Sequence, residues 1–236
     1  MEGSSPADAA PGADGHGPVW TRPKNTGRRP ALTREAIVAA AIELADAEGL
    51  AAVSIRRVAA RLDARAMSLY THIDRKDDLL ELIRDEVAGE LLLEGELPGR
   101  WREALTLIAR RTRESALRHP WMVDLHAVGG APGPNALRHV DQSMAALSGL
   151  GLNAVVAWRI LSAVDHYTLG CVIQEIMQLR RGDQSELLGP YLENVAASGD
   201  YPHLEPILKN GLPDEQDFER GLGWLLDGIE RDLGGE

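Results

Sequence analysis

The chain has 236 residues, of which 44% are hydrophobic, enough for one large domain or for a small domain and a larger one. Its single cysteine, Cys171, excludes an intrachain disulfide framework. It contains neither an apolar run of transmembrane length nor a signal-peptide pattern, so we expect a cytoplasmic protein without membrane contact.

The formal net charge of −11 argues against a nucleic-acid partner only until it is divided along the chain. Residues 1–17 carry three acidic and no basic side chains, whereas residues 18–76 carry 11 Lys or Arg against 6 Asp or Glu. The remaining residues, 77–236, are strongly acidic. A basic segment on an acidic body favours phosphate binding in one orientation.

The first 32 residues are rich in Gly, Ala, Pro and Ser and have little to bury, so we predict a disordered N-terminal extension. Its second half is basic. Arg is attracted by the minor groove of narrow A·T-rich DNA, so we expect this basic arm to lie there if the segment that follows it binds DNA, although such clusters also serve as solubilising tails. The arm residues are Arg22, Lys24, Arg28 and Arg29.

Residues 33–80 predict three helices. The first is capped by Thr33 and stops at Gly49. The second is capped by Ser54 and has apolar residues at helical spacing, and the third follows after only three residues, 63–65. Two short helices joined so tightly cross steeply, as in a helix-turn-helix that places its second helix in the major groove.

Downstream of residue 80 we expect a larger helical domain, 81–236, and therefore an all-α protein. A fourth helix, 75–93, links the two domains, and no alternating strand pattern is present. Segments 119–133 and 199–213 are broken by Pro and Gly and predict loops or short turns. Further helices are expected at about 100–118, 134–149, 153–181, 184–198 and 214–233.

Enzyme motifs are missing: the chain has no HExxH, no GxSxG, no glycine-rich phosphate loop and no CxxC pair. His119 and His126 lie on either side of Pro120, and His139 stands alone, so no metal cluster is indicated. We therefore expect no enzyme, no metal site and no cofactor.

The pair Leu69 and Tyr70, with His72 two residues on and Lys76 opening the next helix, resembles the recognition pattern of the TetR family of transcriptional regulators. The resemblance spans residues 33–80 and combines spacing, turn length and residue type. It implies a DNA-binding domain.

Asp63 departs from the family pattern, which usually has Gly in the turn, but Asp tolerates the left-handed conformation and we expect the turn to persist. Arg56 and Arg65 are the best candidates for hydrogen-bonding guanine. The hydroxyl groups of Ser54, Tyr70 and Thr71 and the ammonium group of Lys76 are candidates for phosphate contacts. The expected DNA contacts besides the arm are Ser54, Arg56, Arg65, Ala66, Met67, Ser68, Tyr70, Thr71, His72 and Lys76.

The body resembles the Tet repressor branch of the family. The run SAVDHYTLG, 162–170, looks like that branch's long dimer-forming helix, and the closing helix from Phe218 fits as well. The resemblance implies a homodimer, whose two-fold symmetry matches a palindromic double-stranded DNA operator.

In that branch a His and an acidic residue help to bind a drug–metal complex. His126 stands at the position of the His, but Gln174 stands at that of the acid, and an amide is a poor substitute for a carboxylate ligand. We therefore expect an aromatic, metal-free ligand, with Trp121 and Met122 alternatively serving as core. The expected pocket residues are Ile108, Thr112, Trp121, Met122, His126, Trp158, Ser162, Asp165, His166 and Gln174.

The resemblance, together with these residues, implies a repressor that a small, polyketide-like aromatic molecule releases from DNA, and we expect it to control an efflux gene. By analogy with the family, release would be a population shift carried by helix 75–93. An excess of Arg over Lys suggests a GC-rich genome, such as that of an actinobacterium. The alternative is a DNA-binding regulator or architectural protein without a small-molecule ligand.

Overall fold

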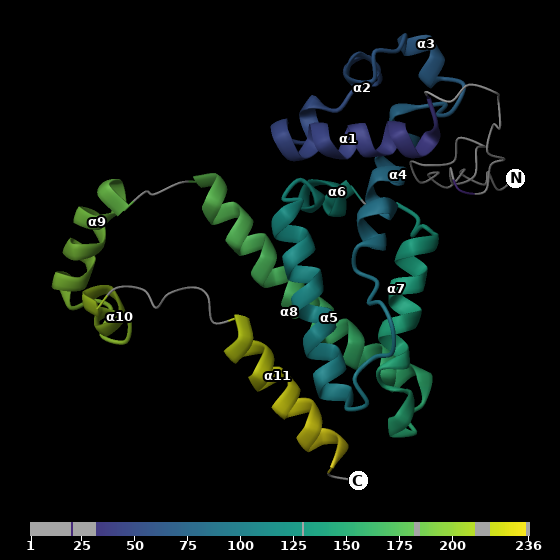
Figure 1. Cartoon of the computed structure of the whole chain (residues 1–236). Coiled ribbons are helices and arrows are strands. Elements are labelled where there is room, and N and C mark those ends of the chain that lie inside the picture. Colours follow the sequence, from purple (N-terminus) through teal and green to yellow (C-terminus); the bar gives the residue numbers. More distant parts are fainter. Residues whose placement is uncertain (1–19, 21–31, 129, 182–184, 211–217, 235–236) are drawn as a thin grey trace, which may run out of the picture.

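The computed structural model describes residues 20, 32–128, 130–181, 185–210 and 218–234. Every regular element among these residues is a helix, which confirms the predicted all-α fold. In Figure 1 a small group of helices, α1 to α3, lies at one end of a larger set of helices, and α4 runs from the first group into the second.

Helix α1, Arg34–Glu48, begins where Thr33 accepts a hydrogen bond from the backbone N–H of Ala36, at 3.1 Å. It ends at Gly49, whose φ of 81° is a left-handed conformation that glycine adopts without strain. A single 3₁₀ turn, η2 (Leu50–Ala52), then leads toward the second helix. The predicted cap and stop of this helix are both confirmed.

Helix α2, Ile55–Arg61, begins at Ser54, whose hydroxyl accepts from the Arg57 backbone N–H at 3.3 Å. Helix α3, Ala66–Leu69, follows after a turn at Asp63, whose φ is 49°. The left-handed aspartate is therefore present, as expected, and the two helices form the predicted helix-turn-helix.

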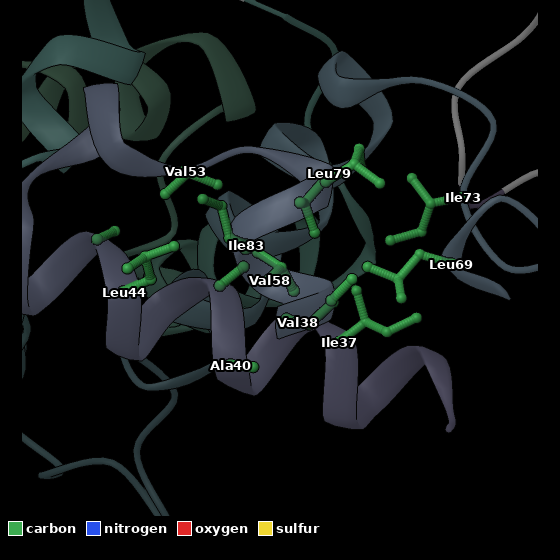
Figure 2. Close-up of a cluster of buried hydrophobic side chains, with 14 of the residues drawn as sticks. Ile37, Val38, Ala40, Leu44, Val53, Val58, Leu69, Ile73, Leu79 and Ile83 are labelled. Atoms are coloured by element: carbon green, nitrogen blue, oxygen red, sulfur yellow. The ribbon is translucent and has the colours of Figure 1, made fainter. Parts of the chain in front are cut away.

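Helix α4, Lys76–Gly89, packs its apolar side between α1 and α2. Figure 2 shows Leu79 and Ile83 of α4 meeting side chains from α1, α2 and the end of α3. The helix stops four residues before the predicted end at residue 93. The core of this end of the molecule includes Ile37, Val38, Leu44, Val53, Val58, Leu69, Ile73, Leu79, Ile83 and Val87, together with Trp121 and Leu125.

The larger part is built on α5 (Trp101–Arg118), α7 (Pro134–Ala145), α8 (Ala154–Arg181) and α11 (Phe218–Leu233). Helix α8 packs against α5, α7 and α11. A separate hydrophobic core results, and it includes Leu105, Ile108, Leu147, Leu161, Val164, Phe218, Leu222 and Leu226.

Helix α7 is shorter than the predicted 134–149, because the chain leaves it at Ala145 and makes a 3₁₀ turn, η3 (Ser148–Leu150).

Two short helices lie inside segments predicted as loops or short turns. They are α6, Met122–Val128, and α10, Glu205–Asn210. Pro206 lies in the first turn of α10, where proline is compatible with a helix, so the proline in the sequence did not exclude one.

Helix α9, Ser185–Ser198, packs against α10. Figure 1 shows these two helices together, apart from the rest of the body, with α8 leading toward them and α11 following. No described helix combines the length and the apolar character needed to cross a lipid bilayer.

Candidate DNA-reading surface and ligand cavity

Helix α3 and the turn after it present polar and apolar side chains to solvent. Leu69 and Ile73 are buried in the core, whereas Met67 is 75% exposed and Tyr70 is 46% exposed. Packing in the core accounts for the apolar side chains of Leu69 and Ile73, but it does not account for the large exposed side chains of Met67 and Tyr70. These two are therefore candidates for contact with DNA. Of the other expected DNA contacts, Arg56, Arg65, Ser68, Thr71 and Lys76 are exposed, and Ser54, Ala66 and His72 are half-buried.

The arginines of α2 differ in what they contact. Arg57 pairs with Glu48 at 2.5 Å, and Arg61 pairs with Glu43 at 3.0 Å, so both are held on the protein surface by α1. Arg56 forms no ion pair with another described residue. Of the α2 arginines, Arg56 is therefore the one whose guanidinium is not already paired within the described part of the chain.

Two expected contacts also have structural roles. Thr71 donates its hydroxyl hydrogen to the carbonyl of Ser68 at 2.7 Å, and the carbonyl of His72 accepts from Arg34 at 3.4 Å. These bonds fix the backbone just after α3. The arm residues, Arg22, Lys24, Arg28 and Arg29, lie outside the described residues.

A cavity of about 200 Å³ lies in the body between α5, α7 and α8. Its walls combine apolar side chains with several polar ones, so they could both bury and orient a small molecule. Six of the ten expected pocket residues line it: Ile108, Thr112, Trp158, Ser162, Asp165 and His166.

Helix α7 contributes three cavity residues that the sequence reasoning missed, His139, Val140 and Ser143. They occupy one face of the helix at helical spacing. The apolar and polar pattern of 134–149 had predicted the helix, but nothing in it indicated which element α7 would face. In the sequence His139 was therefore considered only as a metal ligand, and it was set aside because no other candidate ligand lies near it in the chain.

Two cavity residues have shifted pKa values. Desolvation lowers the pKa of His139, against the opposing effect of Asp165, and desolvation raises the pKa of Asp165, against the effects of His139, His166 and His126. Each shift favours the neutral form of its group.

Trp121 and Met122 require a correction. Trp121 is 2% exposed and belongs to the core beneath α1, where its indole N–H donates to Asp46 at 2.6 Å, and Met122 packs against the same core. The structure therefore places both outside the cavity, in the core role that was the alternative for them. His126 and Gln174 are exposed and are not among the residues that line the cavity.

A polar cluster joins the reading head, formed by α1 to α3, to the body, formed by α5 to α11. We call its members, His119, Asp46, Glu90 and Trp121, the junction cluster. His119 Nδ1 lies 2.7 Å from Asp46 Oδ1, and its Nε2 lies 3.2 Å from Glu90 Oε1. These groups come from α1, from the end of α4 and from the end of α5. The junction cluster thus connects three helices through one imidazole that is only 3% exposed.

Within the described part of the chain, no group of three or more His, Cys, Asp or Glu side chains is arranged to hold a metal ion. Asp165, His139 and His166 share the cavity without forming such a group.

Comparison with known proteins agrees with this two-part architecture. Residues 37–83 match the family model described as "Bacterial regulatory proteins, tetR family", and residues 93–233 match "Tetracyclin repressor-like, C-terminal domain". The chain belongs to the TetR family. It is a DNA-binding transcriptional regulator of the repressor type and not an enzyme, as the sequence resemblance implied.

Curated TetR-family relatives cover nearly the whole chain. An HTH-type transcriptional regulator of Saccharopolyspora erythraea is 35% identical over 234 residues, covering 98% of this chain and 97% of the relative. The HTH-type transcriptional repressor DrrR1 of Streptomyces coeruleorubidus is 33% identical and covers 89% of this chain and 81% of the relative.

Solved structures of the TetR family are similar as well. Apo ActR from Streptomyces coelicolor has a TM-score of 0.74 at 28% identity, covering 88% of this chain and 99% of that one. The same protein in complex with actinorhodin has a TM-score of 0.72 at 27% identity, covering 86% and 99%.

Proposed function

We propose that this TetR-family regulator is a ligand-responsive repressor, which binds a palindromic operator as a homodimer and is released by a small, uncharged aromatic molecule. The observation that carries the proposal is the cavity between α5, α7 and α8, in a body that is joined to the reading head through α4. The regulated gene that best fits an aromatic, polyketide-like inducer is one for its export.

The reading head supports operator binding through its exposed groups. Arg56 and Arg65 each offer a guanidinium, which can donate to two acceptors of guanine at once, and Met67 offers an apolar surface for a thymine methyl group. Lys76 at the start of α4 suits a phosphate. The basic arm of residues 22–29 would extend the contact into the neighbouring minor groove.

A homodimer would cover the apolar side chains that α8 and α11 leave exposed. In the single chain Val155 of α8 is 61% exposed, Leu179 of α8 is 76% exposed and Trp224 of α11 is 68% exposed. Single exposed apolar side chains are common, but several on two adjacent helices favour an interface. Two-fold pairing would set the spacing of the two recognition helices.

The ligand side of the proposal rests on the lining of the cavity. Trp158 and Ile108 supply apolar contact, and Thr112, Ser162 and His166 supply orienting polar groups. Outside this lining, Gln174 stands where the Tet repressor branch has an acidic metal ligand, and its neutral amide is a poorer ligand than a carboxylate, which favours a metal-free compound. The structural neighbour ActR has been solved with actinorhodin and with (S)-DNPA, which indicates what kind of molecule a related body accommodates.

A direct link connects the cavity wall to the reading head. Asp85 of α4 accepts hydrogen bonds from the backbone N–H groups of Asn135 and Ala136, both at 3.0 Å, at the start of α7. The Asn135 side-chain amide donates back to the Asp85 carbonyl at 3.1 Å. A ligand that shifts α7 would therefore move α4 with it, and release follows if the ligand binds that arrangement better than the operator-bound one.

The test begins with genomic fragments that the purified protein retains, since their sequences supply both the operator and the adjacent genes. Fluorescence anisotropy on that operator then measures binding with and without a panel of uncharged aromatic compounds. We expect binding that Arg65→Ala weakens strongly, and release by at least one compound of the panel. Retention of the operator by the protein at saturating concentrations of every compound would contradict the ligand-responsive part.

A further inference from the structure

His139 carries a buried polar atom for which the described residues supply no partner. Its Nδ1 is buried, and it has no hydrogen-bond partner among the described residues. A buried polar nitrogen without a partner is unfavourable, so such atoms in a native fold need an explanation. His139 also lines the cavity, which places this ring beside the space where a ligand would lie.

Other polar groups of the same walls are already engaged within their own helices. The Ser143 hydroxyl donates to the carbonyl of His139 at 2.8 Å, and the Thr168 hydroxyl donates to the carbonyl of Val164 at 2.8 Å. Neither is directed to a neighbour across the cavity. The imidazole of α7 is therefore a better-placed group for an outside partner than these two hydroxyls.

The groups that face this imidazole define what the partner can be. Asp165 and His166 of α8 line the same cavity, and desolvation lowers the pKa of His139 against the opposing effect of Asp165. A neutral imidazole offers one N–H and one lone pair, and the carboxyl group of Asp165 offers acceptor oxygens in either protonation state. A hydroxyl group can donate to one and accept from the other, whereas a carboxylate ligand would suffer repulsion whenever Asp165 ionises.

We propose that His139 is a specificity-determining residue of the cavity, selecting uncharged aromatic compounds that carry a free hydroxyl group over the corresponding ethers. This inference rests on the proposed ligand-responsive function and names the chemical class that the site takes. An ether oxygen cannot donate, and a site built to hydrogen-bond a hydroxyl discriminates strongly against an analogue that lacks it.

The dimensions of the cavity guide the choice of probe. Its volume of about 200 Å³ is below the roughly 300–1,000 Å³ of common ligand sites. A two-ring compound is therefore the appropriate probe, and a dihydroxynaphthalene and the matching dimethoxynaphthalene differ only in the methyl groups that replace the hydroxyl hydrogens. Their binding to the full-length protein without DNA is measured by isothermal titration calorimetry.

We expect the wild type to bind the diol at least about tenfold more tightly than the dimethyl ether, the equivalent of one hydrogen bond. His139→Leu should abolish this preference. His139→Asn, whose amide places a polar atom near the position of Nδ1, should restore part of it. The control is His203→Leu, which removes an exposed histidine that does not line the cavity and should leave the preference unchanged.

A second measurement needs no ligand. If the unpartnered Nδ1 is retained for binding, its removal should stabilise the free protein, so that His139→Leu raises Tm by about 2–4 °C. A histidine kept for structural reasons would give a lower Tm on the same substitution. A lower Tm for His139→Leu overturns the inference, and so does a diol preference that survives in this variant. Failure of the wild type to bind the diol, or to prefer it to the ether, overturns it as well.

Failure of the inference can be told apart from failure of the proposed function. If hydroxyaromatic compounds release operator equally well from the wild type and from His139→Leu, the ligand-responsive function stands and the role of His139 falls. If no aromatic compound releases the operator, the proposed ligand-responsive function is wrong. The calorimetry still reports on binding in the cavity, because that experiment contains no DNA.

Discussion

Replacing His119 by Phe tests the junction cluster, because it keeps a ring of similar size and removes both nitrogens. The imidazole is 3% exposed and lies at 2.7 Å from Asp46 and 3.2 Å from Glu90. After the substitution, both carboxylates face an apolar ring. Asp46 keeps its bond from the Trp121 indole, and Glu90 keeps its ion pair with Arg118.

The magnitude follows from the two hydrogen bonds that the imidazole makes to Asp46 and Glu90. A hydrogen bond to a charged group contributes about 1.5–3 kcal/mol. The side chains of Asp46 and Glu90 are each 33% exposed, so water partly replaces the imidazole as their partner. We therefore expect the free energy of unfolding to fall by about 2–4 kcal/mol in total. For a chain of this size that lowers Tm by roughly 5–15 °C.

The assay is urea and thermal unfolding at one fixed protomer concentration, because dimerisation makes stability depend on concentration. His203→Phe, at an exposed position of the body, is the matched control and should stay within about 0.5 kcal/mol of the wild type. If His119→Phe also stays within that limit, the junction cluster does not stabilise the packing of the head on the body, and the reasoning is refuted.

Three further outcomes are expected. Asp63→Val should lower the free energy of unfolding by about 1–2 kcal/mol, because φ of 49° is unfavourable for a β-branched residue, while Asp63→Gly should be nearly neutral in the same urea titration. Deleting residues 1–30 should weaken operator binding and reduce the slope of log affinity against log salt by about 0.9 for each phosphate that the arm neutralises, and an unchanged slope would remove the arm from the DNA interface. Arg110 donates to Glu219 and lowers the pKa of that carboxyl below its ordinary 4.5. Because the pair is about half exposed, Arg110→Ala should lower stability by at most about 1 kcal/mol at neutral pH. Since the folded-state pKa of Glu219 is lowered, this destabilisation should be complete above pH 4.5 and should vanish as acid protonates Glu219 in the folded protein.

The helix-turn-helix was predictable because its signals are local. The caps at Thr33 and Ser54, the stop at Gly49 and the turn at Asp63 each depend on a few consecutive residues, and each is found where expected. The long helices of the body were predictable for the same reason, from apolar spacing alone.

The cavity was predicted only in part, because it depends on which helices face one another. The resemblance assigned helix α8 to the pocket, so Ser162, Asp165 and His166 were found, whereas nothing assigned α7 to it and His139 was missed. Trp121 was assigned to the pocket because an aromatic residue suits either a pocket or a core. Its burial in the core beneath α1, together with its bond to Asp46, a residue 75 positions away in the sequence, shows that it belongs to the core.

The position of Trp121 and Leu125 has a consequence for chimeric repressors. These two residues come from the body segment of the sequence, yet they complete the core under α1, and Ile83 and Val87 of α4 belong to that core as well. A head transplanted with a junction after residue 80 would carry only part of its own interior. Exchange of heads between relatives, by engineering or by recombination, therefore depends on matching the recipient's α6 to the donor's α1, as well as on the recognition helix.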